Sequence, residues 1–339
     1  MVHFSRKIIW PWMALAVLIG LPIAWIVGTI GVSGAVDRVI LGIKEFFYWP
    51  LLVRMKNIVL TPTFVIILAA TLLLERLFPA DKNQKPFSLS FAHDIVWFFL
   101  QTIGNTIIVA TYVYFLETYY KSHLTHLTIT IWNQYPEWVA MAAWIIVTDF
   151  LYYLQHYINH KVPVFWYFHT IHHSQKNINF FTDFRYHMLE YVVRYTILTV
   201  PMLMFDIDAK KITYFLIFQT WYTRFYHGNI RTNLGVLRYI LVTPQSHRIH
   251  HSKEGRHRDK NFGSILSIWD YLFGTQHRGY EEYPETGIDD HQFPHEASFK
   301  GISLIVTPLK QLIYPFQLIY KNHFVRNKKN LENRGQRPI

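Results

Sequence analysis

The chain has 339 residues, of which 51% are hydrophobic and only 16% charged, a composition too apolar for a water-soluble globular protein of this length. The net charge of +11 fits a basic face against anionic lipid headgroups, and nucleic-acid binding is not expected because the basic residues lie beside apolar stretches. The absence of cysteine excludes disulfides, thiolate metal sites, iron–sulfur clusters and cysteine nucleophiles.

The first apolar stretch, Ile8–Val32, follows the basic pair Arg6 and Lys7. It is longer than the apolar core of a cleaved signal peptide, so we favour a retained membrane segment over that alternative. Together with the basic region that follows, residues 1–57 are expected to form an N-terminal membrane segment and an interfacial region.

Further apolar stretches predict several membrane helices. Ile58–Leu74, Ile95–Leu116 and Trp138–Tyr153 span, or nearly span, the roughly 30 Å of hydrocarbon in a bilayer. Val192–Phe205 and Ile212–Tyr226 are shorter and flank a polar turn, which favours a short or re-entrant hairpin. The predicted fold class is all-α, a polytopic membrane helical bundle with a cytosolic histidine-rich helical cap.

The C-terminal apolar stretch, Ile302–Tyr320, is interrupted by Pro308, Lys310 and Pro315. These residues favour an interfacial segment over a membrane span. We expect the basic tail after it to be disordered. The predicted domains are therefore residues 1–57, a membrane and catalytic domain at 58–301, and a C-terminal interfacial segment with its tail at 302–339.

Three histidine clusters provide the strongest indication of function. Neutral imidazole is the commonest metal-binding side chain, and eight imidazoles in three groups exceed the needs of one ion. Because residues i and i+4 of a helix share a face while adjacent residues diverge by about 100°, a histidine doublet can serve two metals. The sequence thus predicts two metal ions. The clusters are His156 with His160, then His169, His172 and His173, then His247, His250 and His251.

Three more residues are candidates at the same site. His227 follows the second hairpin arm and is expected to be a further metal ligand. For His187, a ligand role and a supporting contact remain open. Asp149 precedes His156 by two helical turns, so it is either a partner that fixes the tautomer of a ligating imidazole or a helix-end residue at the interface.

The spacing of the three clusters resembles the fatty acid hydroxylase/sterol desaturase superfamily. The resemblance includes Thr243–Ser252, Asp259–Gly263 and Ile268–Thr275, and it covers roughly residues 74–275. It implies an integral membrane enzyme with two iron ions, which uses O2 and two electrons to oxidise an unactivated C–H bond of a lipid.

The chain departs from one branch of this family in its fourth histidine region. That branch has paired histidines three residues apart, whereas here His227 stands alone, with Thr223 and Arg231 at the positions on either side. Asn229 is therefore a further possible contact to the metal site, directly or through water.

The expected function is hydroxylation of a fatty acyl, sterol or ether lipid. A lipid or sterol desaturase with the same site is the alternative within the enzymes. A membrane metal transporter or metal-binding protein is the alternative from another class, but a transporter should place ionisable residues within its spans, and here the clusters lie at span ends.

The sequence contains no nucleotide-binding or haem-attachment motif, so electrons are expected from a separate ferredoxin- or cytochrome b5-type donor. An acidic donor would dock on a basic face, for which contact with anionic lipid is an equal alternative. That face is expected to contain Arg248, Lys253, Arg256, Arg258 and Lys260.

The basic residues Arg76, Lys82 and Lys85 place residues 75–94, and with them the histidine clusters, on the cytosolic side of a multi-pass protein. Residues 33–57 are also basic and conflict with this scheme, which leaves the N-terminal topology open. The oligomeric state cannot be read from the sequence.

Overall fold

The computed structural model describes residues 62–208, 211–297 and 301–325, together with a few positions between 24 and 41. The predicted segment Ile8–Val32 lies almost wholly outside the described residues, as does most of the C-terminal tail. The described part of the chain is helical and contains no strand, only three isolated β-bridges. The all-α class is therefore confirmed.

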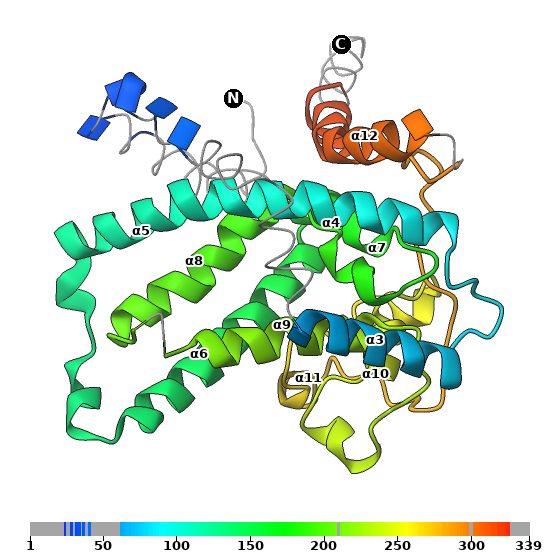
Figure 1. Ribbon diagram of the computed structural model, residues 1–339, viewed down its shortest axis with the longest axis horizontal. Helices are drawn as coiled ribbons and strands as arrows, with labels where there is room; N and C mark the ends of the chain where they lie inside the picture. The colour runs from blue at the N-terminus through cyan, green and yellow to red at the C-terminus, as the bar shows by residue number, and fades with distance from the viewer. Residues whose placement is uncertain are drawn as a thin grey trace, which may run out of the picture.

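Long helices form the body of the molecule, and short helical turns connect them (Figure 1). The longer elements are α3 (Pro62–Leu77), α4 (Leu89–Ile108), α6 (Glu137–Lys161), α7 (Pro163–His173), α8 (Met188–Met204), α9 (Thr213–His227) and α12 (Gly301–Ile319). The shorter ones are η1 (Val109–Val113), α5 (Tyr114–Tyr119), η2 (Tyr120–Leu124), η3 (Thr125–Leu127), η4 (Thr130–Gln134), η5 (Phe180–Phe184), η6 (Gly235–Tyr239), α10 (Pro244–His250), η7 (Gly255–His257), α11 (Ile268–Leu272) and η8 (Tyr320–Val325).

Helices α4 and α5 follow one another along one edge of the molecule, and α12 lies above α4 in Figure 1. Helix α12 packs against α4 and α7, while α6 packs against α7 and α8. Helix α9 contacts η5 and α10. The elements that contain the histidine clusters are thus neighbours in space.

A sharp connection between α6 and α7 brings the first two clusters together. Val162 is extended because it precedes Pro163, and this proline starts α7, where a missing N–H costs nothing. The chain therefore reverses after Lys161, and the end of α6 faces α7.

Two helices in the described part of the chain, Glu137–Lys161 and Gly301–Asn322, are long and apolar enough to cross a membrane. The first contains the predicted stretch Trp138–Tyr153. The predicted stretches Ile58–Leu74 and Ile95–Leu116 overlap helices α3 and α4 but do not meet that criterion.

Helix α12 continues through Pro308 and Pro315, the two prolines that interrupt the C-terminal apolar stretch. Both prolines are buried on one face of the helix, together with Gln311 and Tyr314. Gln311 accepts a hydrogen bond from Trp97 Nε1 at 3.0 Å. Packing on α4 and α7 thus compensates for the hydrogen bonds that proline removes.

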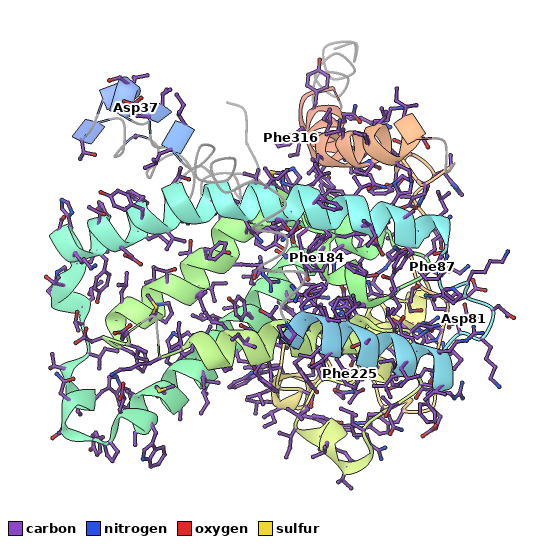
Figure 2. All side chains as sticks on the ribbon, in the orientation of Figure 1. Asp37, Asp81, Phe87, Phe184, Phe225 and Phe316 are labelled. Carbon is purple, nitrogen blue, oxygen red and sulfur yellow. The ribbon has the colours of Figure 1, made fainter. Side chains whose placement is uncertain are left out.

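An aromatic cluster joins α3, α4 and η5 beneath the site. Its buried members are Phe64, Phe98, Phe180, Phe181 and Phe184. Figure 2 shows Phe184 between α4 and α3, in the interior of the molecule. The cluster fixes η5, and with it the chain leading into α8.

Candidate metal centre

Helices α6, α7 and α10 together form a first group of histidines. Their candidate ligand nitrogens all lie within 4.8 Å of one another. Three of the imidazoles are buried and two are partly buried. The group comprises His156, His160, His169, His173 and His250.

A second group is fully buried and draws on α7, α9 and α10. It comprises His172, His227, His247 and His251. Each doublet is divided, since His172 and His173 belong to different groups, as do His250 and His251. All nine histidines predicted as ligands thus lie in one group or the other, while their binding of metal stays a prediction.

The spacing of the ring nitrogens fits a shared ion. His227 Nε2 lies 2.8 Å from His247 Nε2 and 3.2 Å from His172 Nε2, and His160 Nε2 lies 3.1 Å from His173 Nε2. Imidazoles bound to one ion at about 2.0–2.1 Å place neighbouring nitrogens roughly 3 Å apart.

Unpartnered nitrogens support the same interpretation. Nε2 of His156, His169 and His250 is buried and has no hydrogen-bond partner within the described part of the chain. A buried polar atom without a partner is rare unless a ligand satisfies it. The residues present therefore fit a pair of metal ions.

Backbone carbonyls orient several imidazoles from the far side of the ring. His156 Nδ1 lies 3.0 Å from the carbonyl of Phe262, and His250 Nδ1 lies 2.8 Å from that of Lys260. His227 Nδ1 lies 2.7 Å from the carbonyl of its own helix at Thr223. When the Nδ1–H of each ring donates to its carbonyl, Nε2 is unprotonated and its lone pair faces the histidine group.

The loop that supplies two of these carbonyls has an unusual backbone. Asp259 and Asn261, on either side of Lys260, are both left-handed, with φ of 61° and 58°. Asp and Asn tolerate this conformation better than other non-glycine residues. At Gly263 a Cβ would lie 2.7 Å from the carbonyl oxygen of Leu266, so only glycine fits.

Glu190 is a buried acidic residue in contact with the first group. Its Oε2 lies 2.8 Å from His169 Nδ1 and accepts a hydrogen bond from Asn159 at 3.2 Å. The sequence pattern does not predict this contact. The spacing of His187 and Glu190 matches a helix-capping pair, which predicts the start of α8 but not the contact with His169.

Burial keeps these imidazoles neutral. It lowers the pKa of His250 to about 3. Burial first, and then the neighbouring imidazoles, hold the pKa values of His172, His173, His247 and His251 well below the usual value. Neutral imidazole is the form that binds metal.

Asp149 does not contact an imidazole, contrary to one of the two expectations. It accepts hydrogen bonds from the amides of Ile265 and Leu266, at 2.9 and 3.2 Å, and from Trp269 Nε1 at 2.8 Å. Two helical turns, about 10 Å, separate it from His156 along α6. Asp149 instead anchors the loop that supplies the Phe262 carbonyl.

His187 and Asn229 also lie outside both groups. His187 caps α8, since its Nδ1 accepts from the amide of Leu189 at 3.1 Å, and its Nε2 lies 3.2 Å from the carbonyl of Leu312. Asn229 Oδ1 accepts from the amide of Asp81 at 2.9 Å. Both residues therefore connect segments of the chain around the site.

The predicted basic face is smaller than expected. Arg248 is buried and donates to the carbonyl of Pro284 at 2.9 Å, so it cannot dock a partner. Lys253 pairs with Glu285, and Arg256 pairs with Glu254 at 2.8 Å. Most of the charge expected on this face is thus buried or neutralised.

A third set of side chains, which the sequence did not single out, lies outside the two groups. His257 Nε2 and His277 Nε2 each lie 3.1 Å from the carboxylate of Glu282. His257 Nδ1 lies 2.9 Å from Ser252 Oγ, and Arg256 pairs with Glu282 at 2.7 Å. Hydrogen bonds within the protein account for this set, which connects two loops.

Residues 141–275 match the fatty acid hydroxylase family model. Human alkylglycerol monooxygenase is 32% identical over 174 residues, which cover 50% of this chain and 36% of that protein. Ornithine lipid hydroxylase of Rhizobium tropici is 26% identical over 224 residues, which cover 65% of this chain and 66% of that protein. No solved structure matches.

A very-long-chain aldehyde decarbonylase of Oryza sativa subsp. japonica is 26% identical over 226 residues, which cover 63% of this chain and 35% of that protein. The chain thus spans about a third of the length of the alkylglycerol monooxygenases that it matches.

The fold and the site define an all-helical protein with two adjoining groups of buried histidines. Within it, residues 141–275 match the fatty acid hydroxylase family, which confirms the resemblance read from the histidine clusters.

Proposed function

We propose that the chain is a membrane-bound lipid hydroxylase with one iron ion in each histidine group. The observation that carries the proposal is the gathering of nine histidines into two buried groups that contain unpartnered ring nitrogens. The relatives named for hydroxylation of lipids support the reaction class.

Bound iron would supply the activation of O2. The balanced reaction is R–H + O2 + 2 e⁻ + 2 H⁺ → R–OH + H2O. The protein itself orients the imidazoles, through Glu190 and the carbonyls of Lys260 and Phe262, and keeps them neutral by burial.

We further propose a multi-pass membrane location with the histidines on the cytosolic side. The two apolar helices, Glu137–Lys161 and Gly301–Asn322, support membrane insertion, and α6 ends at the first histidine group. Loops on the cytosolic side of a membrane are enriched in lysine and arginine, so Arg76, Lys82 and Lys85 support the cytosolic side.

The electron donor is proposed to be a separate ferredoxin- or cytochrome b5-type protein. The sequence contains no nucleotide-binding or haem-attachment motif, which supports a separate donor. A cavity of about 260 Å³ adjoins His160 and His173. Its charged lining is mixed and does not select an acidic partner, since it comprises Lys253 and Arg258 together with Glu254, Asp259, Asp289 and Asp290.

Lipid mass spectrometry under ¹⁸O2, in cells with and without the full chain, tests the function. A lipid that gains one labelled oxygen is the expected result. Loss of two hydrogens without label would instead support a desaturase, and unchanged lipids with altered cellular metal would support a transporter. His250→Ala serves as the inactive control, and His126→Ala, an exposed histidine outside both groups, as the active one.

A further inference from the structure

Two cavities meet beside the histidine groups. The smaller one reaches three of the histidines. The larger, of about 250 Å³, lies between α4, η5, α6, α8 and α9. Four side chains line both cavities and form the junction between them: Tyr152, Tyr186, Arg194 and Thr223.

Arg194 brings a positive charge to this junction. Its guanidinium lies over the rings of Tyr152 and Tyr186, at 5.3 and 5.0 Å from their centroids. Among the described residues it forms no ion pair with a carboxylate. Asp183, the carboxylate that lines the larger cavity, pairs with Arg224 at 3.9 Å and accepts from Thr223 at 3.0 Å. A partly buried charge without a direct ion-pair partner is costly, and a ligand anion on Arg194 would lower that cost.

Unpartnered amide atoms line the same cavity. Gln101 Oε1, Asn105 Oδ1 and Gln219 Nε2 are buried, and no described residue forms a hydrogen bond with them. Gln101 is 6% and Gln219 8% exposed, so bulk solvent does not satisfy these atoms. An acyl chain would leave all three unsatisfied, whereas a polar group would pair with them.

We propose that the larger cavity binds the anionic headgroup of the lipid substrate, with phosphate or carboxylate oxygens accepting from Arg194 and Gln219 Nε2, and neighbouring hydroxyl groups donating to Gln101 Oε1 and Asn105 Oδ1. Calling the bound lipid a substrate rests on the proposed function. The binding itself depends only on the cavity.

The position of Arg194 also determines which carbon reaches the metal centre. The Tyr186 ring stacks on His172 with centroids 4.3 Å apart, and its hydroxyl lies 3.3 Å from His172 Nε2. The same tyrosine lies under the Arg194 guanidinium. An anion held by Arg194 is thus one side chain away from the second histidine group. The oxidised C–H bond is therefore close to the headgroup, not in the middle of the chain.

Equilibrium binding to the full chain in nanodiscs of neutral lipid, without O2 or reductant, tests the proposal. The probes are hexadecyl phosphate, hexadecanoate and hexadecanol, which share one chain. We expect at least one anionic probe to bind at least about tenfold more tightly than hexadecanol. The anionic probe with the higher affinity then shows whether the site prefers a phosphate or a carboxylate. Equal binding of all three would overturn the proposal. Competition by inorganic phosphate at the affinity of hexadecyl phosphate would also overturn it, since the site would then recognise a free anion.

Arg194→Gln should remove the preference for the anionic probe, leaving it below about twofold. Arg231→Gln is the matched control, because that guanidinium lies over the Tyr283 ring, 4.4 Å from its centroid, and lines neither cavity. A preference that survives in Arg194→Gln contradicts the proposal. If this variant does not fold, Gln219→Leu takes its place, with binding of the anionic probe expected to weaken about tenfold; unchanged binding would count against the cavity.

The site of oxidation gives a second readout. In the ¹⁸O2 experiment, a label within a few carbons of the headgroup supports the inference, and a label in the middle of the chain overturns it. Absence of any labelled product alongside a clear anion preference would instead reject the hydroxylase function while leaving the binding site intact.

Discussion

Glu190 Oε2 lies 2.8 Å from His169 Nδ1, and both side chains are buried. The other carboxylate oxygen accepts from the amide of His187 at 3.3 Å and so caps α8. One side chain therefore fixes the start of a helix and the orientation of an imidazole in the first histidine group.

Substituting Glu190→Gln should weaken metal binding about 10- to 100-fold, because the amide keeps the size of the side chain but loses the charge that holds the His169 ring. Competition with a chelator measures the affinity. Glu254→Gln, which changes an exposed carboxylate paired with Arg256, should leave it unchanged. Equal affinities in the two variants would show that Glu190 does not support the site.

Removing one histidine from either group should mainly affect the ion bound by that group. With five imidazoles in the first group and four in the second, we expect His172→Ala to lower the metal content from about two ions per chain to about one, because the smaller group loses a quarter of its ligands. Elemental analysis after purification in mild detergent measures this. His250→Ala should mainly affect the first group, and His126→Ala should retain both ions. Full metal content in both group variants would contradict the two-ion assignment.

A buried charge network next to the site should dominate the stability of this region. Arg185 is fully buried and pairs with Asp94 and, at 2.6 Å, with Glu296. Arg185→Met would leave two buried carboxylates without their cation, at a cost of about 3–5 kcal/mol, or about 6–20 °C in melting temperature. The thermal midpoint in detergent measures the effect.

The matched control for Arg185 is Lys211→Met. Lys211 pairs with Glu137 on the surface, where a salt bridge contributes little. A midpoint that falls equally in both variants would mean that burial does not determine the cost.

Glu75 should make stability depend on pH. Burial raises the pKa of its carboxyl to about 7. Hydrogen bonds from the amides of Asn229 and Phe180 act in the opposite direction and lower this pKa, but their effect is smaller. A folded-state pKa above the unfolded value gives stability that is present below about pH 4.5 and lost as pH rises towards 7.

Glu75→Gln keeps an acceptor for both amides and removes the titration. Relative to the variant, the wild-type protein should therefore lose about 1–3 kcal/mol between pH 5 and pH 8. Thermal midpoints of both proteins at the two pH values measure the difference. If the difference in thermal midpoint between the two proteins is the same at both pH values, Glu75 does not titrate in this range.

Much of the candidate site was predictable from the sequence because its signals are local. The i, i+4 spacing of His156 and His160 places both on one face of α6, and the doublet His172–His173 necessarily diverges. The helical class followed in the same way from long apolar stretches. These features depend on residues within one or two helical turns of one another.

The expectations that were wrong concern contacts between residues far apart in the sequence, which a local sequence pattern does not determine. Asp149 was a candidate partner for an imidazole two helical turns along α6, but its carboxylate accepts from the loop at Ile265 and Leu266. Arg248 was expected on a basic face, but its side chain turns inward to the carbonyl of Pro284.

The sequence by itself determined the nine histidines, their spacing and the helical class, because periodicity and motif act over short distances along the chain. Only the tertiary structure decided which histidines share a group, that Glu190 holds His169, and that Arg194 stands between the centre and a polar cavity. Those relationships join residues from separate helices, and their energies come from burial and hydrogen bonds that exist only after the helices pack.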